Sequence, residues 1–240
     1  MRSMAGEPRR LAPNWSALNR SALNRSALIR PALVAFLLAW ATNLVSLAVG
    51  ADLVSEWSQN LMLPCLLHSF ALGSRSPVES QTRRLRRGTL AGLFFSWLGD
   101  LLPGFVPHDT SFLAMVGAFL LGHLAFCWGF WPLRQRRHRG LAPYAVAYVA
   151  LMAAIWQGAG DLRGPIVVYG IVLTLMAVLA TGVHRLAAWG GVLFMASDSL
   201  IALQSFRNWH APWLPVTIMA TYGAACLLIT AGVSRCLRRA

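Results

Sequence analysis

The chain has 240 residues, of which 57% are apolar and only 12% are charged, and its net charge is +13. A soluble domain carries about 25% charged residues, whereas the apolar residues here form runs close to the ~20 residues that a membrane-spanning helix needs. The composition therefore excludes an ordinary soluble domain and predicts a helical membrane protein. All the basic residues are arginines, and almost all lie outside the apolar runs. This placement is typical of topology signals and argues against nucleic-acid binding.

Residues 1–30 are polar and basic and contain the pentapeptides SALNR, SALNR and SALIR. A period of five matches neither a helix nor a strand, so we expect a flexible cytoplasmic arm that is attracted to anionic lipid. The apolar run that follows, 31–47, ends near small residues and could alternatively be a cleaved signal peptide. The long polar preamble and the interruption at Asn43 favour a retained first helix.

Eight apolar segments follow the arm. They cover residues 31–50, 57–73, 88–102, 111–132, 141–158, 164–182, 186–204 and 212–234. Basic and weakly charged connections alternate along the chain, and eight spans with both termini in the cytoplasm satisfy the positive-inside rule at every connection. We therefore predict an all-α polytopic membrane protein. Residues 31–235 would form a single bundle of eight transmembrane helices, and residues 236–240 a basic cytoplasmic tail. A prokaryotic chain of this kind would lie in the plasma membrane.

Two aspartates interrupt these apolar segments, Asp100 in SWLGDLL and Asp198 in FMASDSLIAL. Each lies 13 residues beyond the last arginine before its helix, which is about 20 Å from the cytoplasmic edge at the helical rise. His123 and Asn43 fall in nearly the same layer. Because an Asp at a helix centre costs roughly 2.5–3.5 kcal/mol on insertion scales, such residues usually face a bundle interior or a wet cavity.

Each of these polar residues also has a simpler interpretation. A single Asp can be a hydrogen-bonded strut between helices, His123 a satisfied interior histidine and Asn43 a helix-to-helix contact. Two carboxyl groups that face one cavity would instead favour a state in which one holds a proton and the other is ionised. That state is the arrangement that acid–base hydrolysis requires. We take the facing of Asp100 and Asp198 as a hypothesis.

Other catalytic patterns are absent from the sequence. There is no GxSxG or HExxH motif, and the four cysteines show no CxxC spacing. The histidines in the apolar segments lie at different depths on separate helices. We therefore expect neither a metal nor an organic cofactor.

Four sequence pieces together resemble the YhhN-like lysoplasmalogenase family, whose members are membrane proteins with eight spans. The pieces are SWLGDLL (96–102), FLLGHLAF (119–126), GGVLFMASDSLIAL (190–203) and, more weakly, TYGAACLLI (221–229). The resemblance covers residues 31 to about 235. It implies a hydrolase that cleaves the vinyl-ether bond of lysoplasmalogen to a fatty aldehyde and glycerophospho-ethanolamine or glycerophosphocholine. The lysophospholipid substrate would come from the bilayer.

The resemblance implies that Asp100 and Asp198 are the catalytic pair and that His123 is the histidine of the GH motif. The resemblance and the shared depth of the polar residues together predict a candidate site. This site has catalytic residues Asp100 and Asp198 and substrate-binding residues Asn43, His123, Ser197 and Tyr222. We expect the substrate phosphate to lie near Arg163, Arg207 or His210, beyond the opposite end of the spans.

The chain departs from the family pattern at two places. Ala225 stands where the last helix commonly has glutamine, and Gln59-Asn60-Leu61 stands where the second helix often has Lys-Pro-Leu. These departures bear on the head-group preference and on the activity itself. Two alternatives therefore stay open: a proton-coupled transporter of small amphiphiles, and a lysolipid-binding protein without turnover. The sequence has no internal repeat and no pair of broken helices, which are the usual signs of a transporter.

Overall fold

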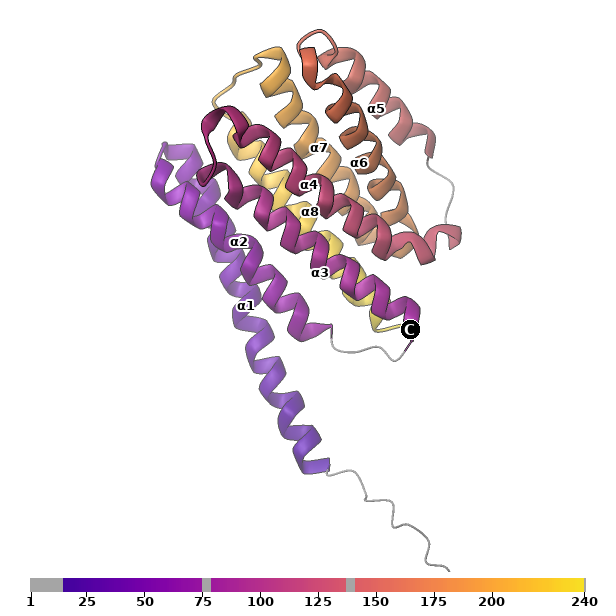
Figure 1. Ribbon diagram of the computed structural model, residues 1–240. Coiled ribbons are helices and arrows are strands. Elements are labelled where there is room, and N and C mark those ends of the chain that lie inside the picture. Colours follow the sequence, from indigo (N-terminus) through magenta and orange to yellow (C-terminus); the bar gives the residue numbers. More distant parts are fainter. Residues whose placement is uncertain (1–14, 75–78, 137–140, 240) are drawn as a thin grey trace, which may run out of the picture.

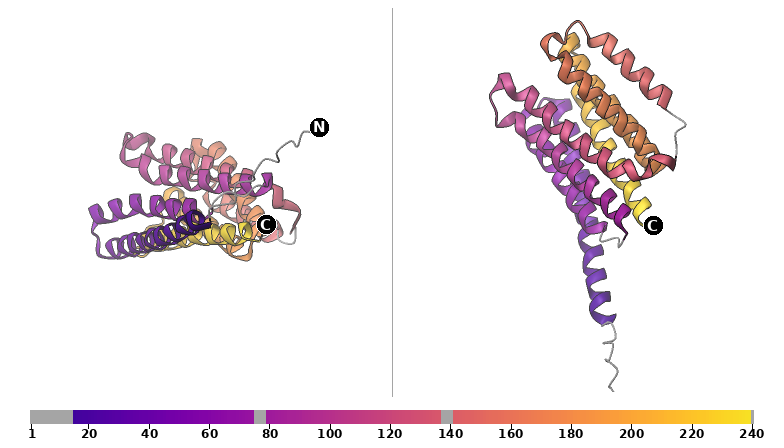
Figure 2. Two further views of the ribbon diagram at one scale, coloured as in Figure 1. Left: turned by 90° about the horizontal axis from the view of Figure 1, so that it is seen from below. Right: turned by 45° about the vertical axis from the view of Figure 1, so that its right-hand side comes forward.

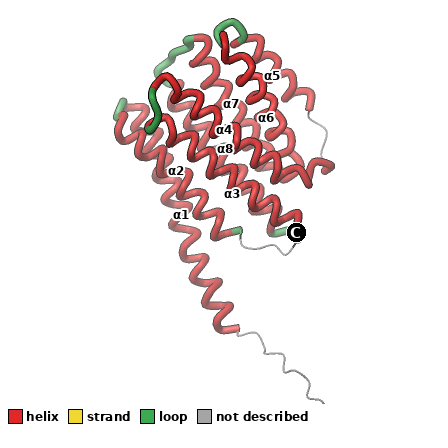
Figure 3. Tube along the Cα trace, in the orientation of Figure 1, coloured by secondary structure: helices red, strands yellow, loops and turns green. Residues whose placement is uncertain are grey.

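The computed structural model describes residues 15–74, 79–136 and 141–239, and in these ranges every regular element is helical (Figures 1 and 3). The α-helices are α1 (Trp15–Val49), α2 (Asp52–Gly73), α3 (Ser80–Leu101), α4 (His108–Phe130), α5 (Leu141–Ile155), α6 (Arg163–Val183), α7 (Arg185–Arg207) and α8 (Leu214–Leu237). Short 3-10 turns lie at Leu102–Gly104, Trp131–Arg136 and Gly160–Leu162. The all-helical prediction is confirmed, and each expected apolar segment corresponds to one α-helix.

Successive helices run in opposite directions, so the chain forms one up-and-down bundle (Figure 1). The connections that follow α2, α4 and α6 lie at the same end as the C-terminus, and the other connections lie at the opposite end. Helix α8 is central, because it packs against α1, α2, α3, α6 and α7. Helices α1 and α5 lie at opposite edges (Figure 2).

Five helical segments are long and apolar enough to cross a membrane. They are Ile29–Val49, His108–Arg134, Gly160–Val183, Arg185–Arg207 and Leu214–Leu237. Helix α5 is apolar but has only 15 residues, and the first turns of α3 contain the sequence RRLRR. Length and composition thus identify a membrane protein, while the prediction of eight crossings stays a prediction.

Helix α1 begins well before the first apolar segment. Residues 15–30, which we expected to belong to a flexible arm, continue the helix from Trp15 and extend it beyond the end of the bundle (Figure 1). The repeated Ala, Leu and Arg residues are good helix formers. Each of them favours the helix individually, so a helix can form although the five-residue repeat does not match the helical period. Residues 1–14 lie outside the described residues.

Glycines allow α3 and α4 to approach each other closely. A Cβ atom on Gly88 would lie 2.5 Å from the Cα atom of Gly129, and a Cβ atom on Gly92 would lie 2.6 Å from the Phe126 ring. Small residues spaced four apart are typical of close helix contacts in membranes, where van der Waals packing replaces the hydrophobic effect as the force between helices. This contact brings the helix that carries Asp100 against the helix that carries His123.

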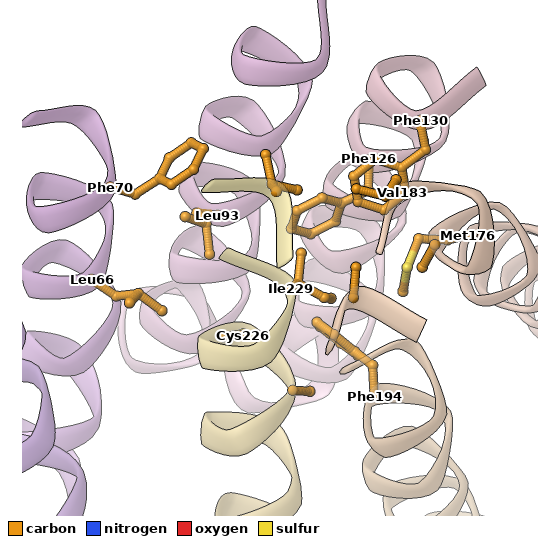
Figure 4. Packing of buried hydrophobic residues seen from close by; sticks show 14 of the residues in the cluster. Leu66, Phe70, Leu93, Phe126, Phe130, Met176, Val183, Phe194, Cys226 and Ile229 are labelled. Carbon is orange, nitrogen blue, oxygen red and sulfur yellow. The ribbon is translucent and has the colours of Figure 1, made fainter. Parts of the chain in front are cut away.

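Helices α6, α7 and α8 pack in the same manner. A Cβ atom on Gly191 would lie 2.9 Å from the Cα atom of Ala177 in α6, and one on Gly232 would lie 2.6 Å from the backbone nitrogen of Ala187 in α7. Buried side chains of the surrounding helices gather around α8, including Phe126 and Phe194 (Figure 4). Asp198 therefore lies on a helix, α7, that packs closely against both α6 and α8.

Candidate active site

Asp100 lies at the end of α3 and connects three helices. Its Oδ1 accepts a hydrogen bond from Gln59 Nε2 on α2 at 3.0 Å, and its Oδ2 accepts one from the Tyr222 hydroxyl on α8 at 2.8 Å. Both carboxyl oxygens therefore have a neutral donor as partner. Asp100 is partly exposed, whereas Tyr222 is only 4% exposed.

Asp198 lies near the middle of α7 and has a different environment. Its Oδ2 accepts a hydrogen bond from the Tyr169 hydroxyl on α6 at 2.5 Å, and His123 Nε2 on α4 lies 3.9 Å from the same oxygen. The second distance exceeds that of a hydrogen bond. Asp198 is 9% exposed.

Five aromatic side chains, which we call the aromatic cluster, fill the space between the two aspartates. They are Phe119, His123, Tyr169, Phe194 and Tyr222. The Tyr222 ring meets the Phe194 ring edge to face at 5.5 Å, and Phe194 meets His123 at 4.7 Å. The His123 ring lies in turn 5.4 Å from that of Tyr169. A continuous series of contacts therefore connects Asp100 to Asp198.

His123 has no hydrogen-bond partner in the described part of the chain. Its side chain is 1% exposed, and both ring nitrogens are without a partner. An unpaired buried polar group costs about 1–3 kcal/mol, so a structural role alone does not explain a histidine at this position. The carboxyl group of Asp198 lies 3.9 Å from Nε2.

An apolar pocket of about 60 Å³ lies between α4, α5, α6 and α7. Asp198 is the only charged residue in its wall. The other lining residues are Phe112, Met115, Val116, Phe119, Leu151, Met152, Ile155, Ile166, Tyr169, Gly170, Leu173, Ile201, Ala202 and Phe206. The pocket extends from Asp198 toward the end of the bundle at which α7 terminates. Its lining suits a hydrocarbon chain, with one acid at its inner end.

Two of the predicted site residues point elsewhere. Asn43 Nδ2 donates a hydrogen bond to the backbone oxygen of Ser55 in α2 at 2.8 Å, and Asn43 is fully buried there. Ser197 Oγ donates to the backbone oxygen of Ile218 in α8 at 3.1 Å. Both side chains thus bind the backbone of a neighbouring helix. The structure brings together the other four predicted residues, which are Asp100, Asp198, His123 and Tyr222.

Two residues that bind the aspartates were missing from the sequence-based site. In the sequence, Gln59 stands out only as part of a departure from the family pattern, and Tyr169 does not stand out. Tyr169 is one polar group in an apolar segment, and tyrosine is common in such segments, so the sequence carries no signal for it. A signal for Gln59 exists, because it is an amide within the predicted second span.

The expected phosphate contacts lie at the pocket end of the bundle. Arg163 Nε donates to the backbone oxygen of Trp156 at 3.0 Å, and its guanidinium stacks on the Trp156 ring at 5.1 Å. Arg207 is exposed and directly follows Phe206 in the pocket wall. Among the described residues, no group of three or more His, Cys, Asp or Glu side chains could hold a metal ion.

The fold and site define a class of protein: an all-helical membrane protein with two carboxyl groups in its interior and an apolar pocket beside one of them. The chain belongs to the YhhN family, which it matches over residues 55–233, as the motif resemblance predicted. It is 32% identical over 208 residues to proteins named lysoplasmalogenase from Mycobacterium bovis and Mycobacterium tuberculosis, covering 81% of this chain and 79% of each relative. It is 33% identical over 177 residues to human lysoplasmalogenase TMEM86B, covering 72% of this chain and 73% of that protein. No solved structure gives a significant match.

Proposed function

We propose that this protein is a lysoplasmalogenase, which hydrolyses the vinyl-ether bond of lysoplasmalogens. The products would be a fatty aldehyde and glycerophospho-ethanolamine or glycerophosphocholine. The observation that carries this proposal is the connection of Asp100 and Asp198 through the aromatic cluster, with Asp198 at the wall of an apolar pocket. The names of the mycobacterial and human relatives support the same substrate.

The chemistry suits a pair of carboxyl groups. An acid protonates the β-carbon of the vinyl ether, and the ether oxygen stabilises the resulting oxocarbenium ion. Water adds to the α-carbon, and the hemiacetal separates into the aldehyde and the free glycerol hydroxyl. Glycoside cleavage divides the same work between two carboxyl groups, of which one donates the proton and the other handles charge or water. General acid catalysis typically contributes about 10²–10⁴-fold in rate.

The pocket and the arginines support one orientation of the lysolipid. Its alkenyl chain would occupy the pocket, with the vinyl ether beside Asp198 and the phosphate near Arg207. A pocket of about 60 Å³ holds only a few atoms of such a chain, so α5 would have to move outward when the substrate enters from the bilayer. Helix α5 suits such a movement, because among the described residues it packs mainly against α6 and α7.

We further propose that all eight helices cross the membrane, with both termini and the basic tail in the cytoplasm. In a prokaryote, this membrane would be the plasma membrane. The antiparallel order supports this topology (Figure 1). It places the arginines at the start of α3, the start of α7 and the end of α8 at one end of the bundle. Reporter fusions that are active only in the cytoplasm should work at both termini and fail at residue 106.

Aldehyde release from a lysoplasmenyl-ethanolamine by the purified protein in detergent tests the proposed activity. The wild type should release aldehyde without any membrane gradient, and Asp100→Asn and Asp198→Asn should each reduce the rate by at least about 100-fold. Asp52→Asn, which changes an exposed carboxylate at the start of α2, should leave the rate unchanged. Full activity in the Asp100 or Asp198 variant, or no aldehyde from a folded wild type, would contradict the proposal.

A further inference from the structure

The two aspartates differ in the number of oxygens that already accept a hydrogen bond. Asp100 accepts one on each oxygen, from Gln59 and from Tyr222. Both donors favour the ionised form of Asp100, since hydrogen bonds to a carboxylate stabilise its charge. The amide and the hydroxyl come from α2 and α8, so they also fix the orientation of the carboxylate relative to the bundle.

Asp198 has one oxygen without such a donor. Its Oδ2 accepts from Tyr169 and lies near His123, whereas Oδ1 accepts no hydrogen bond from any residue in the described ranges. Asp198 also lines the apolar pocket, whereas Asp100 does not. A proton on Oδ1 would therefore meet no competing donor, and it would be held by a residue that lines the pocket.

We propose that Asp198 is the acid that protonates the substrate, whereas Asp100 remains an anion that Gln59 and Tyr222 hold in place. This assignment rests on the proposed function. Gln59 and Tyr222 are then positioning residues for Asp100, and Tyr169 is a positioning residue for Asp198. None of the three needs to touch the substrate.

The assignment gives a balanced reaction. The O–H bond of Asp198 breaks as its proton moves to the β-carbon. The electrons of the carbon–carbon double bond form the new C–H bond. The ether oxygen shares a lone pair with the α-carbon, so the positive charge develops in the electrostatic field of Asp100. Water then adds to the α-carbon and returns a proton to the Asp198 carboxylate, which restores the acid. Transfer of the hemiacetal proton to the glycerol oxygen releases the aldehyde.

Infrared difference spectroscopy reads the protonation of the two aspartates without relying on turnover. The wild-type protein at neutral pH should show the carbonyl-stretch band of a protonated carboxyl group, with the usual shift in heavy water. The band should disappear in Asp198→Asn and remain in Asp100→Asn. Asparagine keeps the size of the side chain, and an unchanged melting temperature would verify folding. Loss of the band in Asp100→Asn only, or its absence from the wild type, would overturn the assignment.

Kinetics of the positioning residues provide a second test. Gln59→Leu should lower kcat by about 10-fold or more and leave KM unchanged, because Gln59 holds the anion and makes no contact with the pocket. The infrared band of Asp198 should remain in this variant. Gln81→Leu changes an exposed glutamine at the other end of the Asp100 helix and should leave kcat and the band unchanged. An unchanged kcat in Gln59→Leu would contradict its positioning role.

The two readouts separate failure of this assignment from failure of the proposed function. A wild type that releases no aldehyde but shows the expected band pattern would refute the lysoplasmalogenase activity and retain the protonated Asp198. A wild type that releases aldehyde but loses the band in Asp100→Asn would retain the activity and reverse the roles of the aspartates.

Discussion

His123 Nε2 lies 3.9 Å from Asp198 Oδ2, although the two residues belong to α4 and α7. The imidazole is buried among Tyr169 and Phe194 and has no hydrogen-bond partner in the described ranges. An arrangement that leaves a buried polar group unpaired next to a carboxyl group is unfavourable for stability, and such sites in proteins are often functional.

His123→Leu should therefore have opposite effects on stability and on activity. Replacement of the unpaired imidazole by an apolar side chain removes a desolvation cost of about 1–3 kcal/mol, so the melting temperature in detergent should rise. The rate of aldehyde release should fall, because Asp198 loses the imidazole that lies 3.9 Å from its Oδ2. His68→Leu, at an exposed position on α2, is the control for both measurements. A lower melting temperature together with full activity would refute this interpretation.

Tyr169→Phe should lower kcat by about 10–100-fold. The substitution removes only the hydroxyl that donates to Asp198 Oδ2. Asp198 becomes a carboxylate as it transfers its proton, and a hydrogen bond to a charged group contributes about 1.5–3 kcal/mol. The Asp198 side chain would then lose the contact that fixes its orientation at the pocket. Tyr144→Phe, on the outer helix α5, removes a hydroxyl for which the described residues provide no hydrogen bond and should leave kcat unchanged. Equal rates for the two variants would exclude a positioning role for Tyr169.

Ala202→Phe should raise KM for long-chain lysoplasmalogens more than for short-chain analogues. Ala202 lines the pocket on the side away from Asp198 along α7, and a benzyl group there would occupy space that we assign to the alkenyl chain. Val192→Phe places the same side chain at an exposed position on the same helix. KM measured against chain length tests the assignment, and a uniform change at all lengths would mean that the chain lies elsewhere.

Arg207→Ala should raise KM and leave kcat nearly unchanged, because we assign the arginine to the substrate phosphate rather than to the reacting bond. Removal of one exposed charge contact corresponds to about 1 kcal/mol or less, so a factor of up to about five is expected. Arg185→Ala removes an exposed arginine at the opposite end of α7 and should have no effect on KM. Identical KM values for wild type and Arg207→Ala would place the phosphate at another site.

Gly88→Ala should destabilise the protein strongly, because the new methyl group would lie 2.5 Å from Gly129 Cα and 2.7 Å from the backbone oxygen of Ala125. Backbone atoms cannot move aside as a flexible side chain can, so α3 and α4 would have to separate, at a cost of about 1–3 kcal/mol or more. Gly117→Ala on α4 meets no atom within 4 Å and should be tolerated. Melting temperatures in detergent compare the two variants directly.

The existence of the helices and the depth of the aspartates follow from the sequence. A membrane leaves a spanning backbone little alternative to the helix, and the helical rise is constant. Counting residues from the nearest arginine therefore predicts that Asp100, Asp198 and His123 lie in one layer, and in the structure the aromatic cluster joins them. Local propensity also explains why the SALNR repeats continue α1, although the five-residue period suggested an irregular arm.

The rotation of each helix about its axis depends on packing between helices, which the sequence of a single segment does not contain. Asn43 and Ser197 lie near the expected depth, but both point to a neighbouring backbone. Gln59 and Tyr169 were not expected at the site, but packing turns them toward the aspartates. The glycine contacts of α3 with α4 and of α7 with α6 and α8 set the rotations of those helices. Axial position is a property of the chain, whereas the direction of a side chain is a property of the assembled bundle.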